Sequence, residues 1–427
     1  MVVYEHQRLK IGQPVGGPGQ TDRVFEQRHW DALASYTGRT GSRAFGIGHR
    51  TITVGHHVGY LQVGTLRMEL LPKLRSADDW HWRALLLHML REVLDVRITA
   101  QPTSPLHARA GSLYHVLVDR FLRLVEGLMR EGLQRAYWEE EDNGTCMRGR
   151  LLLTRHLREN VVHRERLAVA YPVFDADTLA NRALHQALLR VRATTSDDTR
   201  RTTTNALLGA FPEVGAQRVR PEDFARLQTS QRAESYAEAL ELARLLLAAE
   251  RPDLHWGGAP VISLLFDMNA LFEGYVLRQL RRIEELTVHA QASRPFWQGD
   301  QGTTRRSRPD LVVQRHDPAR RPDGPRLIID TKWKIPSADR PSNDDLRQLF
   351  AYLRSFKASE GLLLYPCASP TQRAVHGTFT PDGDRGGFAF LKLLHDGKPD
   401  RDKVREELRA LLHCSAPSQV CASQPPL

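Results

Sequence analysis

Three side chains in the last third of the chain have the types that metal-assisted hydrolysis of a phosphodiester requires. Asp310 follows a proline, and Asp330 stands two residues before Lys332. Such a hydrolysis needs a cation that neutralises the developing charge and lowers the pKa of the attacking water. Magnesium takes hard oxygen ligands, usually one or two carboxylates, and a nearby lysine orients or deprotonates the water or stabilises the transition state. Together these three residues predict a magnesium-dependent catalytic site.

The sequence around these residues predicts two strands that bring them together. The apolar runs Leu311–Val313 and Leu327–Ile329 stand on either side of His316–Pro325, a segment rich in proline. Short apolar runs separated in this way are typical of antiparallel strands joined by a surface loop. A hairpin is therefore expected here.

Pairing about the centre of this loop places Asp310 across from Asp330 or Thr331. Because side chains alternate between the two faces of a strand, Asp330, Lys332 and Lys334 share one face. The two carboxylates and the lysine are thus expected side by side at one end of the hairpin.

Two helices are expected to flank this hairpin. Asp344–Phe356 predicts a helix on which Gln348 and Tyr352 share a face, since they stand four residues apart. These two side chains are expected to meet a backbone phosphate or the catalytic lysine. Upstream, Asp267–Ile283 predicts a helix with an apolar stripe, bordered by Glu273. A carboxylate at such a border is most often a solvated edge residue; here it is an option for supporting the metal ligands or for a third ligand.

The rest of the chain shows a β-rich beginning and a helical middle. Between Gly46 and Leu74, apolar and polar residues alternate and are broken by glycines, which predicts short strands joined by tight turns. From about 148 to 251 the pattern is mostly helical. Apolar residues at spacings of three and four predict helices over Trp80–Leu94, Ser112–Trp138, Leu179–Val191 and Ser235–Leu247.

A chain of 427 residues is long for one hydrophobic core, so several domains are expected. The stretch from Glu250 to Pro260 holds two prolines besides two glycines and predicts a domain boundary. The expected architecture is multidomain, α+β or α/β. Its parts are a β-rich N-terminal domain (1–110), a mainly helical middle region (111–255), a C-terminal α/β domain (256–413) and a loose tail (414–427).

Composition narrows the class of protein. The net charge of +10, carried mostly by arginine, suits a partner that is a polyanion, although GC-rich coding produces the same arginine bias. No run of 18 apolar residues is present, so no membrane span is expected, and the N-terminus does not have the pattern of a secretory signal. The four cysteines lack zinc-site spacing and indicate free thiols in a reducing cytoplasm.

At this point several segments resemble a known family. Pro309-Asp310, then Asp330-Thr331-Lys332, then Gln348 and Tyr352 resemble the PD-(D/E)xK nuclease superfamily with its trailing QxxxY helix. More narrowly, FDMNALFEGYVLRQL, SRPDLVV, LIIDTKWK and DDLRQLFAY are similar to McrC, the nuclease subunit of McrBC-type modification-dependent restriction systems. In the N-terminal half, GYLQVGTLRMELLPKL, MRGRLLLTRHLREN and FDADTLANRAL also match family segments.

The resemblance implies a C-terminal domain with the restriction-endonuclease-like α/β fold that cuts double-stranded DNA with Mg²⁺, or with Mn²⁺ in its place. The metal ligands expected there are Asp310, Asp330 and the backbone carbonyl of Thr331, with Glu273 as a further option. Lys332 is the catalytic lysine, and Gln348 and Tyr352 support it.

The resemblance also implies a partner, a hexameric McrB-like AAA+ GTPase on which the N-terminal and middle regions dock and whose GTP hydrolysis they stimulate. The partner is expected to bind the GTP, because this sequence has no GxxxxGK[ST] phosphate loop. The segment after Gly144, MRGRLLLTRH, is either a contact with the partner or a plain structural turn. Such a complex belongs in the prokaryotic cytoplasm.

Two other functions compete with this one. The first is a DNA-docking or GTPase-activating adaptor whose nuclease fold has lost its activity, against which the intact Asp310, Asp330 and Lys332 speak. The second is a stand-alone repair-type nuclease of the same superfamily, which keeps the site and needs no partner.

Overall fold

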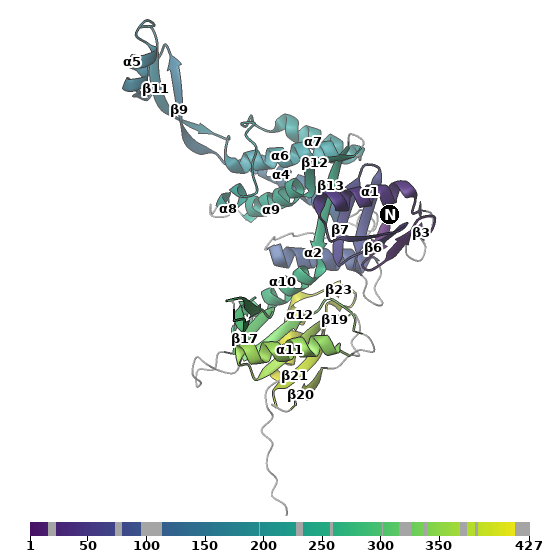
Figure 1. Cartoon of the computed structure of the whole chain (residues 1–427). Coiled ribbons are helices and arrows are strands. Elements are labelled where there is room, and N and C mark those ends of the chain that lie inside the picture. Colours follow the sequence, from purple (N-terminus) through teal and green to yellow (C-terminus); the bar gives the residue numbers. More distant parts are fainter. Residues whose placement is uncertain are drawn as a thin grey trace, which may run out of the picture. The chain divides into compact units, whose positions relative to one another are not determined.

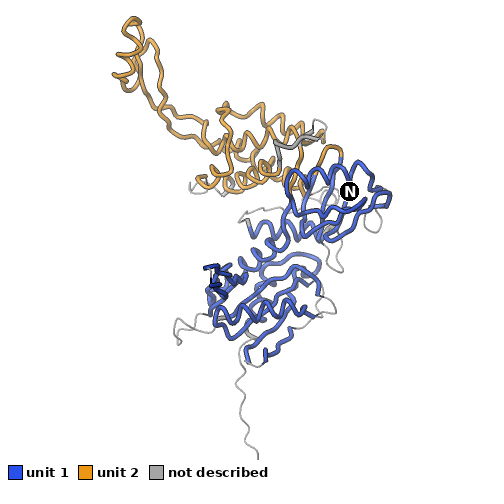
Figure 2. The backbone as a smooth tube through the Cα atoms, viewed as in Figure 1, with its two compact units in different colours: residues 1–61, 66–96, 265–427 blue, residues 62–65, 97–264 orange. Residues whose placement is uncertain are grey.

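The computed structural model describes the chain in twelve stretches and divides it into two compact units. The described residues are 1–15, 23–72, 79–94, 113–195, 197–227, 234–256, 259–300, 302–315, 326–336, 340–367, 374–380 and 383–414. Unit 1 comprises residues 1–61, 66–96 and 265–427, and unit 2 comprises residues 62–65 and 97–264 (Figure 2).

The N-terminal part of unit 1 is built from short strands and two helices, as the alternating pattern predicts. β8 pairs with the parallel strand β1 and with β7, and β6 lies between β2 and β5 in an antiparallel sheet. The elements are β1 (Val2–Tyr4), β2 (Arg8–Lys10), β3 (Pro14–Val15), β4 (Arg23–Val24), α1 (Gln27–Thr40), β5 (Phe45–Gly48), β6 (Thr51–Val54), β7 (His57–Val63), β8 (Leu66–Leu71) and α2 (Asp79–Leu94).

The C-terminal part of unit 1 is a six-stranded mixed sheet with the order β14-β17-β18-β19-β21-β20. β18, β19 and β21 run parallel to one another. β17 is antiparallel to both of its neighbours, β14 and β18. The elements are α10 (Met268–Arg281), β14 (Leu286–Ala290), β15 (Arg294–Gln298), β16 (Thr304–Ser307), β17 (Leu311–Arg315), β18 (Arg326–Thr331), α11 (Asn343–Phe356), β19 (Glu360–Cys367), β20 (Val375–Thr378), β21 (Arg385–Lys392), β22 (Leu394–His395), β23 (Lys398–Pro399) and α12 (Arg401–Cys414).

The helix α11 covers one face of this sheet (Figure 1). Its apolar side chains Leu349 and Leu353 are fully buried and form one cluster with Ile328 of β18 and Leu363 of β19. Because side chains alternate along a strand, the position two residues after Ile328 lies on the same face. Asp330 is therefore carried on the side of the sheet that faces α11.

The helix α10 begins and packs as its sequence predicts. Asp267 caps it, with Oδ1 accepting from the backbone N–H of Asn269 at 2.8 Å. The predicted apolar stripe is buried, Met268, Phe272 and Val276 included. α10 contacts β14 and β18 of the sheet and also α2, the helix that ends the N-terminal part of unit 1.

Unit 2 contains a bundle of helices and a long β-hairpin. Buried Asn181 ties the bundle together: its Nδ2 donates to the carbonyls of Gln134 and Ala176, and its Oδ1 accepts from the hydroxyl of Tyr236 at 2.9 Å. The elements are α4 (Leu113–Glu131), β9 (Ala136–Gly144), β10 (Arg150–Leu151), α5 (Leu153–Glu159), β11 (Leu167–Asp175), α6 (Leu179–Thr194), α7 (Asp198–Ala210), α8 (Asp223–Leu227), α9 (Glu234–Ala249), β12 (Glu250–Trp256) and β13 (Ala259–Asp267).

The hairpin of β9 and β11 extends away from the helices of its unit (Figure 1). Its pairing runs unbroken from Ala136 opposite Asp175 to Gly144 opposite Leu167. The short strand β10 pairs with β11, and α5 follows it directly. Gly149 is required before β10, since its φ is +65° and a Cβ there would lie 2.3 Å from the carbonyl oxygen of Ala170.

The structure corrects two predictions. The helix expected over Ser112–Trp138 ends at Glu131, because Gly132 adopts a φ of +93° that stops it. The mostly helical middle also holds the strands β9, β10 and β11. Neither of the two long strands alternates, because β9 carries four acidic residues in a row and β11 begins with a run of apolar residues. The strands β12 and β13 pair where a boundary was expected, between Glu250 and Pro260, and the division between the two units follows at Leu264 and Leu265.

Several predictions fall on residues outside the description or concern the chain as a whole. The loop His316–Pro325, the boundary between residues 110 and 111, and the tail after residue 414 lie outside the described residues. Among the described residues, Cys146 and Cys367 form no disulfide. Within the described stretches, no helix is long and apolar enough to cross a membrane.

Candidate functional site

The predicted site forms where β17 begins and β18 ends. The two strands are antiparallel, with Leu311 opposite Ile329, which confirms the expected hairpin pairing. The next position outward places Asp310 beside Asp330. Since β18 lies between β17 and β19 in the sheet, Asp330 is only 1% exposed.

Burial dominates the electrostatics of Asp330. It raises the pKa of this carboxyl from 3.8 to about 6, the Lys332 ammonium acts against that rise, and the negative charge of Asp310 adds to it. A carboxyl whose pKa burial raises in this way is often part of a functional site.

Thr331 fixes the orientation of Asp310. The Asp310 Oδ2 atom accepts from the backbone N–H of Thr331 at 2.8 Å and from its hydroxyl at 2.7 Å. Both hydrogen bonds use the same oxygen, so the carboxylate is held through one atom. The sequence predicted a role for the carbonyl of Thr331; the structure adds the amide and the hydroxyl as the groups that hold Asp310.

Lys332 reaches from the end of β18 to both Asp330 and α11. Its Nζ lies 2.7 Å from Asp330 Oδ2 in an ion pair and donates to Gln348 Oε1 at 2.8 Å. The backbone N–H of Lys332 donates to the carbonyl of Leu364 in β19 at 2.9 Å, which anchors the residue to the sheet. Gln348 Nε2 in turn donates to the Tyr352 hydroxyl at 2.6 Å. Of the two contacts proposed for this helix, the one with the lysine is present.

Glu273 lies on α10 near the two aspartates without forming a hydrogen bond to either. Its Oε1 accepts from Gln291 Nε2 at 2.8 Å. Burial raises the pKa of Glu273, and the charges of Asp310 and Asp330 raise it further. The charges of all three carboxylates therefore act on one another.

The sequence did not indicate Gln291, which connects Glu273 to Arg308 and Asp310. Gln291 bridges Glu273 and Arg308, whose guanidinium donates to its Oε1, and the Gln291 backbone N–H donates to the carbonyl of Asp310 at 2.7 Å. Gln291 adopts a φ of +48°, a conformation that L-residues rarely hold without support from their surroundings. Nothing in the local sequence marks Gln291, because its partners come from two separate segments, the helix α10 and the residues just before β17.

The sequence also did not indicate Asp345, which anchors the first turn of α11. Asp345 is buried and accepts from the Tyr365 hydroxyl at 3.1 Å and pairs with Lys334 Nζ at 2.6 Å. It also forms a capping box with Ser342 at the start of α11. Burial opposes ionisation of Asp345, but the bonds from Lys334 and Ser342 outweigh it and hold its pKa below the usual value. The position of Gln348 therefore depends on Asp345.

The arrangement offers oxygen ligands at the exposed end of a buried strand. Asp330 is enclosed, while Asp310 and Lys332 are partly exposed and Gln348 is exposed, so a large substrate can reach the site from solvent. Among the described residues, no three His, Cys, Asp or Glu side chains stand close enough to form a metal cluster.

Comparison with known proteins places the chain. A sequence profile described as "McrBC 5-methylcytosine restriction system component" matches residues 52–366. No curated protein matches the chain.

The structure is similar to McrC bound to McrB AAA+ hexamers in a tetradecameric assembly from Thermococcus gammatolerans, with a TM-score of 0.67 and 19% identity over 96% of this chain and 99% of that one. A second structure, the McrBC complex of the same organism, gives a TM-score of 0.49 and 20% identity over 66% of this chain and 87% of that one. Because the profile spans most of the sequence, the chain belongs to the family of McrBC 5-methylcytosine restriction system components.

Proposed function

We propose that this chain is the DNA endonuclease subunit of a McrBC-type restriction complex and hydrolyses phosphodiester bonds at the site of Asp310, Asp330 and Lys332. One observation carries the proposal: the Lys332 ammonium lies 2.7 Å from the buried Asp330 carboxylate, beside Asp310, at the open end of the sheet. The types and spacing of these residues fit the PD-(D/E)xK pattern. A mixed sheet with α10 and α11 packed against it is the kind of scaffold that this pattern needs.

The donor set suits magnesium, or manganese in its place. Magnesium is usually held by one or two protein carboxylates, with water and phosphate completing its shell. Asp310 and Asp330 meet this requirement, with the Thr331 carbonyl next to them and Glu273 as a further oxygen donor. Asp330 Oδ2 is buried and contacts the Lys332 ammonium; among the described residues it has no further polar partner, so it keeps a lone pair for a cation. When bound, the ion neutralises charge on the phosphate and lowers the pKa of the attacking water.

Lys332 is oriented before any substrate arrives. Its ammonium is held between Asp330 and Gln348, so it needs no rearrangement to face negative charge on a phosphate. Because it is ion-paired with a carboxylate, we assign it the stabilisation of the charged transition state rather than removal of a proton from water. Gln348 and Tyr352 act through it as positioning residues.

Replacement of Asp330 by alanine tests this assignment. The Asp330→Ala variant should lose magnesium-dependent DNA cleavage by at least about a hundredfold, because the ion and Lys332 both lose their main partner. A plasmid-nicking assay measures the loss, and circular dichroism checks the fold. Asp31→Asn is the control, since Asp31 is an exposed carboxylate on α1. Undiminished cleavage by Asp330→Ala refutes the assignment.

We further propose that the chain docks on a McrB-like AAA+ GTPase hexamer that binds the GTP, and that docking stimulates its hydrolysis. The similar Thermococcus structure is McrC bound to McrB AAA+ hexamers. In this chain, many large apolar side chains are exposed on β9, β11, α5 and the segments that join them. Such a group of exposed apolar side chains is typical of a surface that binds another protein. These side chains are Tyr137, Trp138, Met147, Leu153, Leu157, Val161, Val162 and Phe174. The predicted MRGRLLLTRH segment lies within this group, which favours a contact with the partner over a plain turn.

A further inference from the structure

The hairpin of β15 and β16 stands directly before the catalytic aspartate in the chain. β16 ends at Ser307, three residues before Asp310. Between residues 294 and 308 the sequence carries four arginines and one acidic residue, Asp300. Two large aromatic side chains, Phe296 and Trp297, are 59% and 51% exposed. Exposed aromatic rings beside spare positive charge are typical of surfaces that bind nucleic acid.

Two of these arginines fasten the base of the hairpin. Arg306 donates from Nε to the hydroxyl of Ser293 at 2.8 Å and from Nη2 to its carbonyl at 3.0 Å. Arg308 donates to Gln291, whose backbone N–H bonds the Asp310 carbonyl. These bonds stay within the protein, and they tie the hairpin to the site. A contact made by the hairpin is therefore set at a defined distance from the scissile bond.

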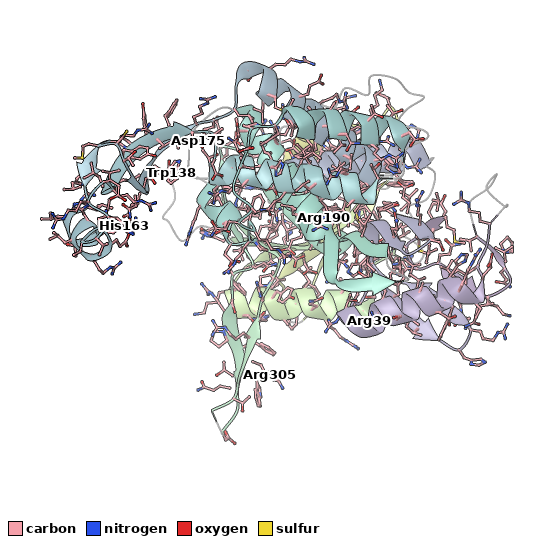
Figure 3. The ribbon with its side chains drawn as sticks, turned by 90° about the horizontal axis from the view of Figure 1, so that it is seen from above. Arg39, Trp138, His163, Asp175, Arg190 and Arg305 are labelled. Carbon is pink, nitrogen blue, oxygen red and sulfur yellow. The ribbon has the colours of Figure 1, made fainter. Side chains whose placement is uncertain are left out.

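The other exposed groups are arranged for a contact outward. Trp297 is paired with Arg305 across the two strands, so their side chains share one face. The bulge next to Trp297 displaces Phe296 from the regular pairing. The Arg305 side chain is exposed, and within the described part of the chain its guanidinium has neither an ion pair nor a hydrogen bond. Figure 3 shows Arg305 on the hairpin where it extends beyond the neighbouring elements.

Trp297 is exposed but not loose. A Cβ placed on Gly299 would lie 2.6 Å from the Trp297 ring, so the indole packs against the backbone of this glycine. An exposed indole held in one place loses little freedom on binding, which suits an anchor for a ligand. Any larger residue at position 299 displaces the ring.

We propose that the hairpin of β15 and β16 is a DNA-contacting arm of the nuclease site. Trp297 and Phe296 pack against sugars and bases in a groove of the duplex, and Arg305 binds a backbone phosphate on the same side. The arm fixes the register of the DNA relative to Asp310. This inference rests on the proposed function, because it assigns the binding surface of the same site.

DNA accounts for these features better than a protein partner does. An interface between proteins would leave the Arg305 charge to be paired by an acidic residue of unknown origin, whereas every nucleotide offers a phosphate. Gln291 also links Arg308, at the base of the hairpin, to the Asp310 carbonyl. Such a link is useful if the molecule that the hairpin binds is the one that is cut beside Asp310.

The test measures DNA affinity separately from cleavage. The full chain binds a fluorescein-labelled duplex in EDTA at low salt, so that nothing is cut, and anisotropy gives the Kd. Trp297→Ala should weaken binding about tenfold, as expected for loss of one stacked ring. Arg305→Ala should lower the dependence of log Kd on log salt by about one, as expected for one phosphate contact. Trp297→Phe and Arg305→Lys should restore most of each effect.

Two controls account for the loss of an exposed apolar side chain or charge in itself. Ile47→Ala removes a large apolar side chain that is 43% exposed on β5, and Arg39→Ala removes an exposed arginine at the end of α1; neither should change the Kd. Wild-type affinity of Trp297→Ala and Arg305→Ala, or no binding by the unaltered chain, overturns the inference. So does intact DNA binding with loss of the complex with a AAA+ partner, which would assign the arm to a protein. Cleavage by Asp330→Ala would overturn the proposed function instead, so the two failures are distinguishable.

Discussion

The Lys332 ammonium is held by Asp330 of β18 and Gln348 of α11. A short sequence motif therefore locates the site, but it does not give all the contacts that position its side chains. The motif residues Asp310, Asp330 and Lys332 stand next to apolar runs, and their spacing on a strand follows from backbone geometry alone. Their alignment could therefore be predicted. The bonds of Gln291 could not, because its partners Glu273 and Arg308 stand 18 and 17 residues away in the chain.

Gln348 provides the prediction at this scale. Gln348→Ala removes the hydrogen bond that holds the Lys332 ammonium beside Asp330. The single-turnover rate of cleavage should fall about tenfold, the value of one such bond, while the Kd for DNA stays unchanged. Ser355→Ala is the control on the same helix, since its hydroxyl bonds only its own helix, at Ala351. A weaker Kd with an unchanged rate would show that Gln348 instead contacts a phosphate.

At the scale of elements, the strands and helices around the site were predictable and their partners were not. α10 and α11 lie where their apolar spacing places them, to within two residues at each end. Trp333, between Lys332 and Lys334, shows what local patterns leave out. Its indole N–H donates to buried Glu5 at 2.9 Å and its ring packs against Phe272. The site strand is thus bonded to the first turn of the chain, a contact that no local pattern encodes.

The packing of α2 against α10 should depend on pH. His88 of α2 lies 3.2 Å from the Tyr275 hydroxyl of α10, and burial lowers its pKa from 6.5 to about 4. Between pH 6.5 and pH 4, His88 is protonated in the unfolded chain and neutral in the folded chain. The free energy of unfolding therefore falls as the pH drops from 6.5 to 4, by up to about 3 kcal/mol, and is unaffected by this group above 6.5.

Denaturant unfolding at pH 7.5 and pH 5 measures this effect. His88→Gln keeps a polar group near Tyr275 but does not titrate, so its loss of stability between the two pH values should be smaller than that of the wild type. His163→Gln changes an exposed histidine of unit 2 and should behave as the wild type does. Equal acid sensitivity of His88→Gln and the wild type would contradict the assigned role.

At the scale of the whole molecule, the chain order conceals the division into units. Unit 1 combines the two ends of the sequence, and the middle of the chain forms unit 2. Sequence patterns are local, so they divided the chain into successive domains. The return of the chain at α10, which packs on α2, is what joins the ends. Cooperative units of this kind depend on long-range burial that periodicity does not report.

The hairpin of β9 and β11 gives a prediction at this scale. The double variant Leu153→Asp/Leu157→Asp places two charges on the exposed apolar side of α5 and should weaken binding to a McrB-like AAA+ hexamer by at least about tenfold. Mass photometry of the mixed proteins with GTP measures the complex. Val375→Asp, an exposed apolar position on β20, is the control. Complex formation at wild-type levels would show that the partner binds elsewhere.

The central claim is that this chain itself cuts DNA at Asp330 and depends on a partner for GTP. The most direct measurement combines the chain, a McrB-like GTPase, GTP and Mg²⁺ with a plasmid that contains 5-methylcytosine, and records GTP hydrolysis and DNA cleavage in the same reaction. Asp330→Ala is predicted to stimulate GTP hydrolysis as the wild type does and to leave the DNA intact. Cleavage by this variant, or stimulated hydrolysis without cleavage by the wild type, would contradict the account.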